Sequence, residues 1–196
     1  SACAGGDGGD GGAIAALVAA RAAHAMRDET RYRIWLGRAA DQGEEARVAR
    51  LMTETELAIE ARRFDEAAEH LEALKLAGHR HIAVLRLSLK VAAARLQWDE
   101  VLRLTRQLRK HKALSDEAAE PLLRRAHVER MTDLAADAPA LAAYWNEIPA
   151  DELRDRRLVE DAVPLLAAAG QGALARRTLE RLLDEEWDSN LARLYG

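Results

Sequence analysis

The sequence predicts an all-α fold, an α-solenoid of tetratricopeptide-like helix–turn–helix repeats. Composition is the first reason: hydrophobic residues make up 49% of the 196 residues and are mostly Ala and Leu, whereas aromatic residues make up 4%. Ala and Leu favour helices, and the β-branched and aromatic residues that favour strands are sparse. The second reason is a repeat: the segment FDEA at 64–67 matches WDEV at 98–101 at an offset of 34 residues, the period of tetratricopeptide repeats.

This offset also aligns apolar and small residues on either side of the match. It places Leu51 on Leu85, Ala58 on Ala92, Leu71 on Thr105 and Leu74 on Leu108. In each repeat an aromatic residue, Phe64 or Trp98, ends the turn between two helices. The following Asp65 or Asp99 is predicted to cap the second helix. The small residue three places after the aromatic residue, Ala67 or Val101, is predicted to let the two helices approach closely.

The elements follow in chain order. Residues 1–12, SACAGGDGGDGG, are predicted to form a flexible leader because they carry too little apolar surface to pack. Residues 13–196 are predicted to form one repeat domain. Helices are expected at 13–26, around 32–36, and at 44–61, 65–76, 81–96, 99–109, 115–131, 139–148, 153–169 and 174–183.

Breaks separate these helices. Gly43 and Gly78 are expected to end the helices before them, and Pro149 to end the helix at 139–148. Pro164 is expected to kink its helix, and residues 170–172 are expected to form a turn. The ending WDSNLARLYG predicts the start of another helix at Trp187. Because a terminal repeat should show a polar outer face, the chain is expected to be a fragment of a longer array.

Charge and cysteine content restrict the function. The formal net charge is −4 and the pI is near 5.9, which argues against a protein that binds nucleic acid by bulk charge. Cys3 is the single cysteine, so no internal disulfide can form. No uncharged apolar run in the sequence is long enough to form a membrane-spanning helix.

Catalytic motifs are not supported. Residues 6–11, GDGGDG, match G-x-G-x-x-G formally, but no strand precedes them as dinucleotide binding requires. The four serines lie at chain ends or helix positions, and neither a P-loop nor H-E-x-x-H occurs. We expect a non-enzyme with no cofactor of its own and no metal site.

The histidines offer a weak ligand signal. His79 and His81 share a turn and could contact a metal or a haem iron, but no carboxylate or cysteine lies near them in the sequence. A solvated turn is the alternative that the pattern favours.

A basic stripe is predicted on one helix. Arg103, Arg106 and Lys110 share a face. The stripe is interpreted either as a solvated outer face or as a surface that attracts an acidic partner or anionic lipid headgroups.

The repeat geometry gives a candidate binding surface. In helix-pair solenoids the first helix of each pair lines the inner, concave face, where partners bind. The repeat register predicts that this face carries Met52, Glu56, Ile59, Arg86 and Lys90, with Arg157 and Glu160 at the comparable face farther along. Arg86 and Lys90 are spaced i, i+4, as binding of a carboxylate would require; the alternative is a surface pair with no binding role.

Three segments resemble a known family. They are HIAVLRLSLKVAAARLQWDEVLRL at 81–104, LAAYWNEIPADELRDRRLVEDAVPLLAAAG at 141–170 and LLDEEWDSNLARLYG at 182–196. RAAHAMRDETRYRIWLGRAADQG, near the start, is similar to the first repeat region of the same family. Together they look like HemY, the proteobacterial inner-membrane protein associated with haem biosynthesis, over about residues 13–196. The Trp followed by Ile-Pro and the terminal W-D-x-x-L-x-x-L-Y-G carry most of this resemblance.

The resemblance implies more than the residues do. HemY proteins carry two N-terminal membrane helices with the repeat domain on the cytoplasmic side, and this chain would be their soluble repeat portion. Four aromatic residues match aromatic positions of the family: Tyr144, Trp145, Trp187 and Tyr195. They are interpreted either as core residues packed between helices or as ligand contacts. No catalytic residues are carried over. The unrelated flavin-dependent oxidase that shares the family's name would need a dinucleotide fold.

Together these observations predict a non-catalytic adaptor whose concave face binds protein partners, with enzymes of late haem synthesis as the expected ones. The alternative is direct binding of porphyrin or haem in the same groove, where Arg86 or Lys90 would meet the propionates. Nucleic acid is not an expected partner, and the membrane is reached only through an N-terminal anchor that the sequence does not contain.

Overall fold

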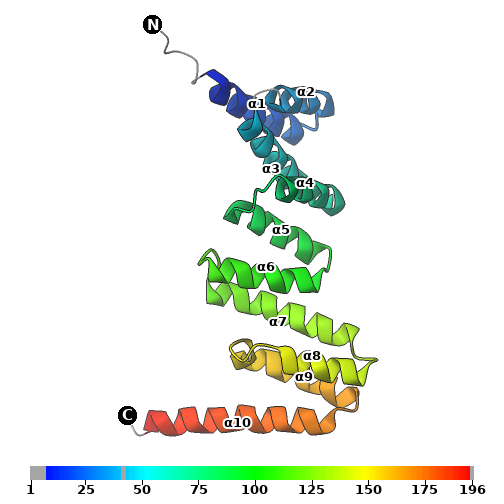
Figure 1. Cartoon of the computed structure of the whole chain (residues 1–196), viewed down its shortest axis with the longest axis vertical. Coiled ribbons are helices and arrows are strands. Elements are labelled where there is room, and N and C mark those ends of the chain that lie inside the picture. The colour runs from blue at the N-terminus through cyan, green and yellow to red at the C-terminus, as the bar shows by residue number, and fades with distance from the viewer. Residues whose placement is uncertain (1–7, 41–42, 195–196) are drawn as a thin grey trace. The chain divides into compact units, whose positions relative to one another are not determined.

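A computed structural model describes residues 8–40 and 43–194, and the side chains of 11–39 and 43–184. These residues form ten α-helices and one short 3₁₀ helix, and they contain no strand (Figure 1). Neighbouring helices pack in pairs, so the prediction of an all-α helical-repeat fold is confirmed. Within the described part of the chain, no helix is both long enough and apolar enough to cross a membrane.

Helix contacts divide the chain into two compact units, Ser1–Arg95 and Leu96–Gly196. The boundary falls between two helices that the sequence analysis assigns to one repeat. A single repeat domain over 13–196 therefore stays a prediction. The two units are described separately below.

The first unit contains two helical hairpins and a fifth helix. Helix α1 pairs with α2, and α3 pairs with α4 while also contacting α1 and α5. One core cluster joins α1, α2 and Leu57 of α3, and a second joins α3, α4 and α5. The helices are α1 (Gly8–Ala25), α2 (Glu29–Ala40), α3 (Glu44–Glu60), α4 (Phe64–Leu76) and α5 (Ile82–Ala94).

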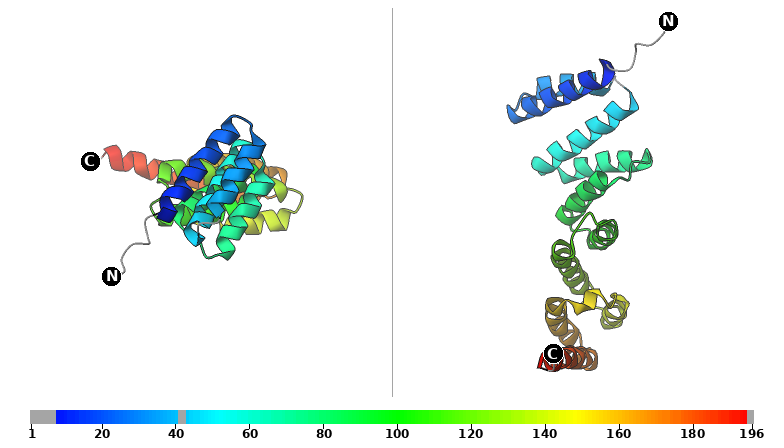
Figure 2. Two further views of the ribbon diagram at one scale, coloured as in Figure 1. Left: turned by 90° about the horizontal axis from the view of Figure 1, so that it is seen from above. Right: turned by 90° about the vertical axis from the view of Figure 1, so that its left-hand side faces the viewer.

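In the second unit α6 pairs with α7, α9 pairs with α10, and α7 also contacts α9 (Figures 1 and 2). Its core cluster includes Met131, Leu141, Trp145 and Leu166, each at most 3% exposed. The elements are α6 (Trp98–Lys110), α7 (Asp116–Asp133), α8 (Ala138–Glu147), the 3₁₀ helix η1 (Glu152–Arg154), α9 (Arg156–Ala168) and α10 (Gly172–Leu194).

The turns that end the helices follow the repeat. Helices α1, α3 and α5 are each followed by a non-glycine residue with left-handed backbone, Arg27 (φ 58°), Arg62 (φ 59°) and Leu96 (φ 56°). Gly78 (φ 84°) after α4 and Lys112 (φ 55°) after α6 are related to each other by the repeat offset. Such residues let the next N–H groups bond back to the last carbonyls, as Arg63 does to Ala58 at 2.8 Å.

The residues that the repeat offset aligns are buried alike. Both members of each aligned pair, from Leu51 with Leu85 to Leu74 with Leu108, are at most 7% exposed. Trp98 is buried at 7%, whereas its counterpart Phe64 is only half-buried. The repeat thus predicts core positions correctly in both units.

The predicted capping role of Asp65 and Asp99 is wrong. Helices α4 and α6 begin at the aromatic residues, and neither N-cap residue makes a side-chain capping bond. The two aspartates lie one position into the helix and form ion pairs instead: Asp65 Oδ1 is 3.0 Å from Arg95 Nε, and Asp99 Oδ1 is 2.7 Å from Arg130 Nε. The first pair joins the start of α4 to the end of α5, and the second joins the start of α6 to the last turn of α7.

Three boundaries differ from the sequence analysis. Helix α1 begins at Gly8, so the last part of the predicted flexible leader is helical, while residues 1–7 lie outside the described part. Leu153 lies in η1, and α9 begins only at Arg156. Helix α10 runs without a break to Leu194, so no separate helix starts at Trp187. Tyr195 lies outside the described residues.

Candidate functional site

A buried carboxylate is the centre of the most elaborate polar network in the described residues. Glu152 follows Pro149 in the connection between α8 and α9, and it is 5% exposed. Arg106 of α6 donates two hydrogen bonds to it, from Nε at 2.7 Å and from Nη2 at 2.8 Å. This bidentate geometry is the strong form of the arginine–carboxylate pair. The pair fixes η1 against α6, two elements that lie far apart in the sequence.

His127 extends the network into α7 and α8. Its side chain is 1% exposed; its Nε2 lies 2.7 Å from Glu152 Oε2, and its Nδ1 lies 2.8 Å from the Tyr144 hydroxyl. Because the carboxylate can only accept, Nε2 carries the proton in this contact. Burial raises the pKa of Tyr144 to about 12, so the phenol stays neutral at physiological pH.

Opposing effects set the charge of Glu152. Burial raises its pKa, but the hydrogen bonds from Arg106 and His127 outweigh this effect and lower the pKa to about 2. The hydrogen bond to Glu152 in turn raises the pKa of Arg106. The carboxylate is therefore ionised and fully partnered. Chemically, the network is suited to holding four elements together.

A cavity of about 370 Å³, here called the α6–α8 cleft, opens beside this network. Tyr144, His127 and Arg106 line it together with Asp99 and Arg103. Arg103 is held by Glu100 at 2.6 and 2.7 Å, and Arg106 by Glu152. The positive charges that border this cleft are thus compensated within the protein. Glu147, Leu102 and Ile148 complete its lining.

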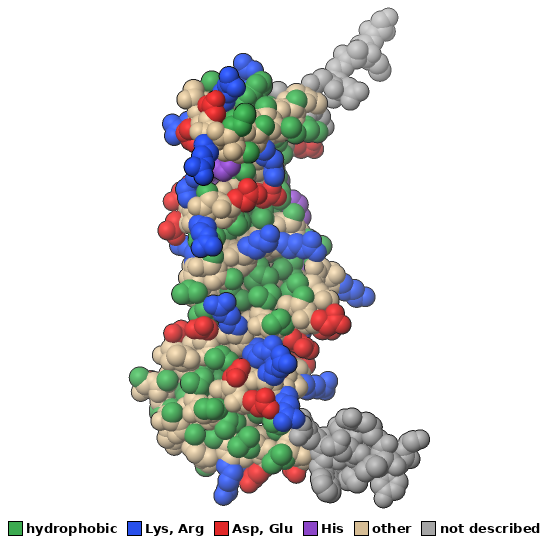
Figure 3. All heavy atoms as spheres, turned by 180° about the vertical axis from the view of Figure 1, so that it is seen from behind, with side chains coloured by type: hydrophobic (Ala, Val, Ile, Leu, Met, Phe, Trp, Pro, Cys, Tyr) green, Lys and Arg blue, Asp and Glu red, His purple; other side chains and the backbone are tan. Residues whose placement is uncertain are grey.

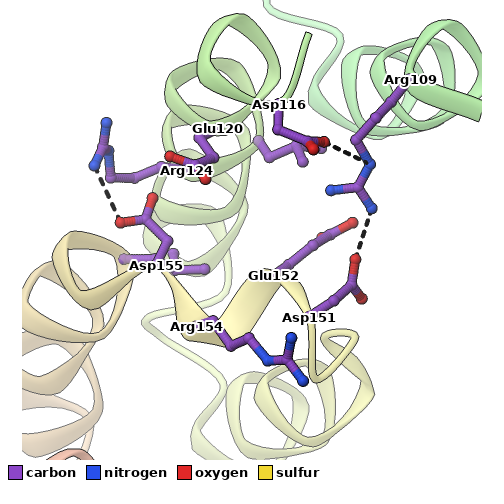
Figure 4. A pocket seen from close by; sticks show the side chains of 10 residues that line it. Arg109, Asp116, Glu120, Arg124, Asp151, Glu152, Arg154 and Asp155 are labelled. Atoms are coloured by element: carbon purple, nitrogen blue, oxygen red, sulfur yellow. Dashed lines mark hydrogen bonds and ion pairs between the residues drawn. The ribbon is translucent and has the colours of Figure 1, made fainter. Parts of the chain in front are cut away.

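A second cavity, of about 300 Å³, lies on the other side of Glu152 (Figure 4). Arg109 Nη2 reaches Asp151 at 2.7 Å, and its Nε is 4.0 Å from Asp116. Arg124 donates to Asp155 at 3.2 Å, and Asp155 also caps α9 by accepting from the Arg157 amide at 3.0 Å. Figure 4 shows these pairs on opposite walls, with Arg154 turned away from them.

No group of three or more metal-ligating side chains occurs in the part of the chain that the structure describes. The turn histidines are separated, with ring centroids 6.3 Å apart. One carboxylate from another helix comes near this turn, with Glu44 Oε1 of α3 at 3.8 Å from His79 Nε2. Cys3 lies outside the described residues.

The structure distributes the predicted binding residues over both units. Met52, Glu56 and Ile59 lie on α3, where all three are half-buried, and Glu56 forms an ion pair with Arg21 of α1. Arg86 and Lys90 are exposed on α5, which contacts α3. These five residues therefore belong to neighbouring helices of the first unit.

Arg157 and Glu160 belong to α9 of the second unit. Both are exposed, and Glu160 accepts a hydrogen bond from Arg156 at 2.6 Å.

The predicted basic stripe is divided between different roles. Arg106 points into the Glu152 network and Arg103 pairs with Glu100, so the stripe is not a row of three solvated cations. Lys110 is exposed. On the face drawn in Figure 3, basic and acidic side chains are interspersed over each unit.

Sequence reasoning missed His127, Glu152 and the role of Arg106. The three residues lie far apart along the chain, and no motif links them. One signal was available: a histidine and two arginines at 124, 127 and 130 recur every third residue along α7, which places them on one side of the helix.

A scan against protein-family models, a search of curated proteins and a search of solved structures found no match to this chain.

Proposed function

We propose that the chain is a non-catalytic helical-repeat module that binds a protein partner through α1, α3 and α5 of its first unit. The observation that carries this proposal is the layer formed by these helices. Helix α3 contacts both α1 and α5, so equivalent residues of successive helices lie along one surface, the arrangement that repeat proteins use for binding.

The chemistry of this surface supports a partner with acidic groups. Met52 and Ile59 pack against the core that Leu87 and Val91 of α5 help to form, yet both remain partly accessible. The repeat register pairs Met52 with Arg86 and Glu56 with Lys90. Exposed cations beside partly accessible apolar side chains are suited to an acidic, amphipathic segment.

The biological context, association with enzymes of late haem synthesis at the bacterial inner membrane, is part of the proposal. It is supported by the resemblance of the segments at 81–104, 141–170 and 182–196 to HemY. The porphyrin alternative gains no support from the α6–α8 cleft, because both ring nitrogens of His127 are already engaged.

The test is affinity capture from a proteobacterial lysate, analysed by mass spectrometry. The double variant Arg86→Glu, Lys90→Glu is compared with the parent and with a matched variant that reverses Arg33 and Arg38, two exposed arginines of α2. We expect partners, among them enzymes of haem synthesis, to be lost only from the Arg86/Lys90 variant. Equal capture by all three proteins would show that this surface is not the binding site.

A further inference from the structure

A third cavity, of about 530 Å³, lies between α8 and α10 of the second unit and is here called the α8–α10 cleft. Trp145, Leu153 and Leu174 form its apolar wall, and Arg177 and Arg181 border it from α10. Asn146 and Thr178 add neutral hydrogen-bonding groups. Its volume lies within the range of ligand-binding pockets.

The charges of this cleft differ from those of the α6–α8 cleft. There, Glu100 and Glu152 neutralise Arg103 and Arg106. The described residues that line the α8–α10 cleft include two arginines and no acidic residue. Within the described part of the chain, neither Arg177 nor Arg181 has an ion-pair or hydrogen-bond partner, whereas the adjacent Arg176 lies 3.5 Å from Glu180.

The two arginines are positioned to act together. They are spaced i, i+4 on one helix, so both guanidinium groups can approach the same ligand. Guanidinium groups bind carboxylates through paired, charge-assisted hydrogen bonds. The apolar wall beside them would accept a hydrophobic side chain next to that carboxylate.

We propose that the α8–α10 cleft binds an acidic peptide segment of a partner protein, with Arg177 and Arg181 holding a carboxylate and Leu153 and Leu174 contacting a neighbouring apolar residue. The proposal rests on the proposed function, because it assigns a second contact to the same kind of partner. We infer an acidic occupant because the described lining of the cleft carries two arginines and no acidic residue.

The test measures binding of a fluorescein-labelled peptide of four Glu-Leu-Asp repeats to the full chain by fluorescence anisotropy. Arg177→Glu and Arg181→Glu are each compared with Arg176→Glu, which makes the same charge change on the same helix but outside the cleft. We expect each cleft variant to weaken binding at least about tenfold, the effect of losing one charge-assisted contact, and Arg176→Glu to weaken it less than about twofold.

Two controls complete the test. A Gln-Leu-Asn peptide of equal length should not bind, because it lacks the carboxylates. Circular dichroism should show unchanged helix content, since all three arginines are exposed. Equal weakening by all three substitutions would overturn the proposal and indicate general charge attraction.

The Arg86→Glu, Lys90→Glu variant separates this inference from the proposed function. If that variant loses partner capture while the cleft variants keep both partner capture and peptide binding, the α8–α10 cleft is not a contact and the proposed function stands. If peptide binding depends on Arg177 and Arg181 while partner capture is indifferent to Arg86 and Lys90, the α8–α10 cleft is the binding site and the first-unit surface is not.

Discussion

The segment 27–112 and the segment that follows it, 113–171, are both helical, but different interactions hold their helices. In 27–112 the buried side chains and the left-handed turns recur with the repeat. In 113–171 this register fades, and Glu152 and His127 of this segment bond to each other and join it to Arg106 of α6. Within a helical array, a buried polar network can therefore add to apolar packing where the repeat register is lost.

Removing the centre of that network should have the largest effect. We expect Glu152→Ala to destabilise the second unit by about 4 kcal/mol, because it leaves Arg106 and His127 without their partner. Glu147→Ala, which changes an exposed glutamate that lines the neighbouring α6–α8 cleft, is the matched control and should change stability by less than about 0.5 kcal/mol.

Hydrogen exchange gives the measurement, because it resolves the units separately. Protection should fall in α6, α7 and α9 while α1–α4 keep theirs. If both glutamate variants melt like the parent, the network does not contribute to stability, and the contrast between the two segments is lost.

The second unit should also lose stability in acid. The folded pKa of Glu152, about 2, lies below its ordinary value of 4.5. Its contribution is therefore fully present above pH 4.5 and is lost as the pH falls from 4.5 to 2, by about 3 kcal/mol. Denaturant titrations at several pH values should show that the free energy of unfolding falls more steeply below pH 4.5 for the parent than for Glu152→Gln. An equal loss of stability in both proteins would show that Glu152 is not the group responsible for the acid sensitivity.

The periodic segment predicts equal effects at equivalent positions. Leu74 is 0% exposed and Leu108 is 1% exposed, and the two occupy the same position of the repeat. We expect Leu74→Ala and Leu108→Ala each to cost about 3 kcal/mol, the usual loss for a buried leucine. Denaturant unfolding with hydrogen exchange would compare them. A difference above about 2 kcal/mol, nearly the whole spread known for such substitutions, would show that shared register does not mean shared packing.

The same contrast explains what the sequence could predict. The fold class and the buried positions from Leu51 to Leu108 follow from local composition and a repeat, which act over one period of chain. The capping role of Asp65 failed because the aromatic residue itself begins the helix, which leaves the carboxylate free to pair with Arg95. Both interactions satisfy an aspartate, and the sequence alone does not choose between them.

The polar network could not be predicted for a different reason. Arg106 looks like one member of a basic stripe, and only the fold reveals that the distant Glu152 turns it inward. Ion pairs between distant segments leave no periodic pattern in a sequence. The α8–α10 cleft likewise depends on the path by which α10 returns past α8.

The smallest expected effect concerns the left-handed turns of the periodic segment. Leu96 has φ 56° and is 59% exposed, so its side chain adds little packing, while its Cβ makes the left-handed backbone unfavourable by roughly 1–2 kcal/mol. Leu96→Gly should therefore stabilise the protein by about 0.5 kcal/mol, since the greater flexibility of glycine in the unfolded chain offsets part of the gain. Leu179→Gly is the matched control: Leu179 is 39% exposed inside α10, where glycine should destabilise by about 1 kcal/mol. Thermal melts of the two variants should move in opposite directions, and a destabilised Leu96→Gly would mean that this turn is held by its side chain rather than by the repeated backbone geometry.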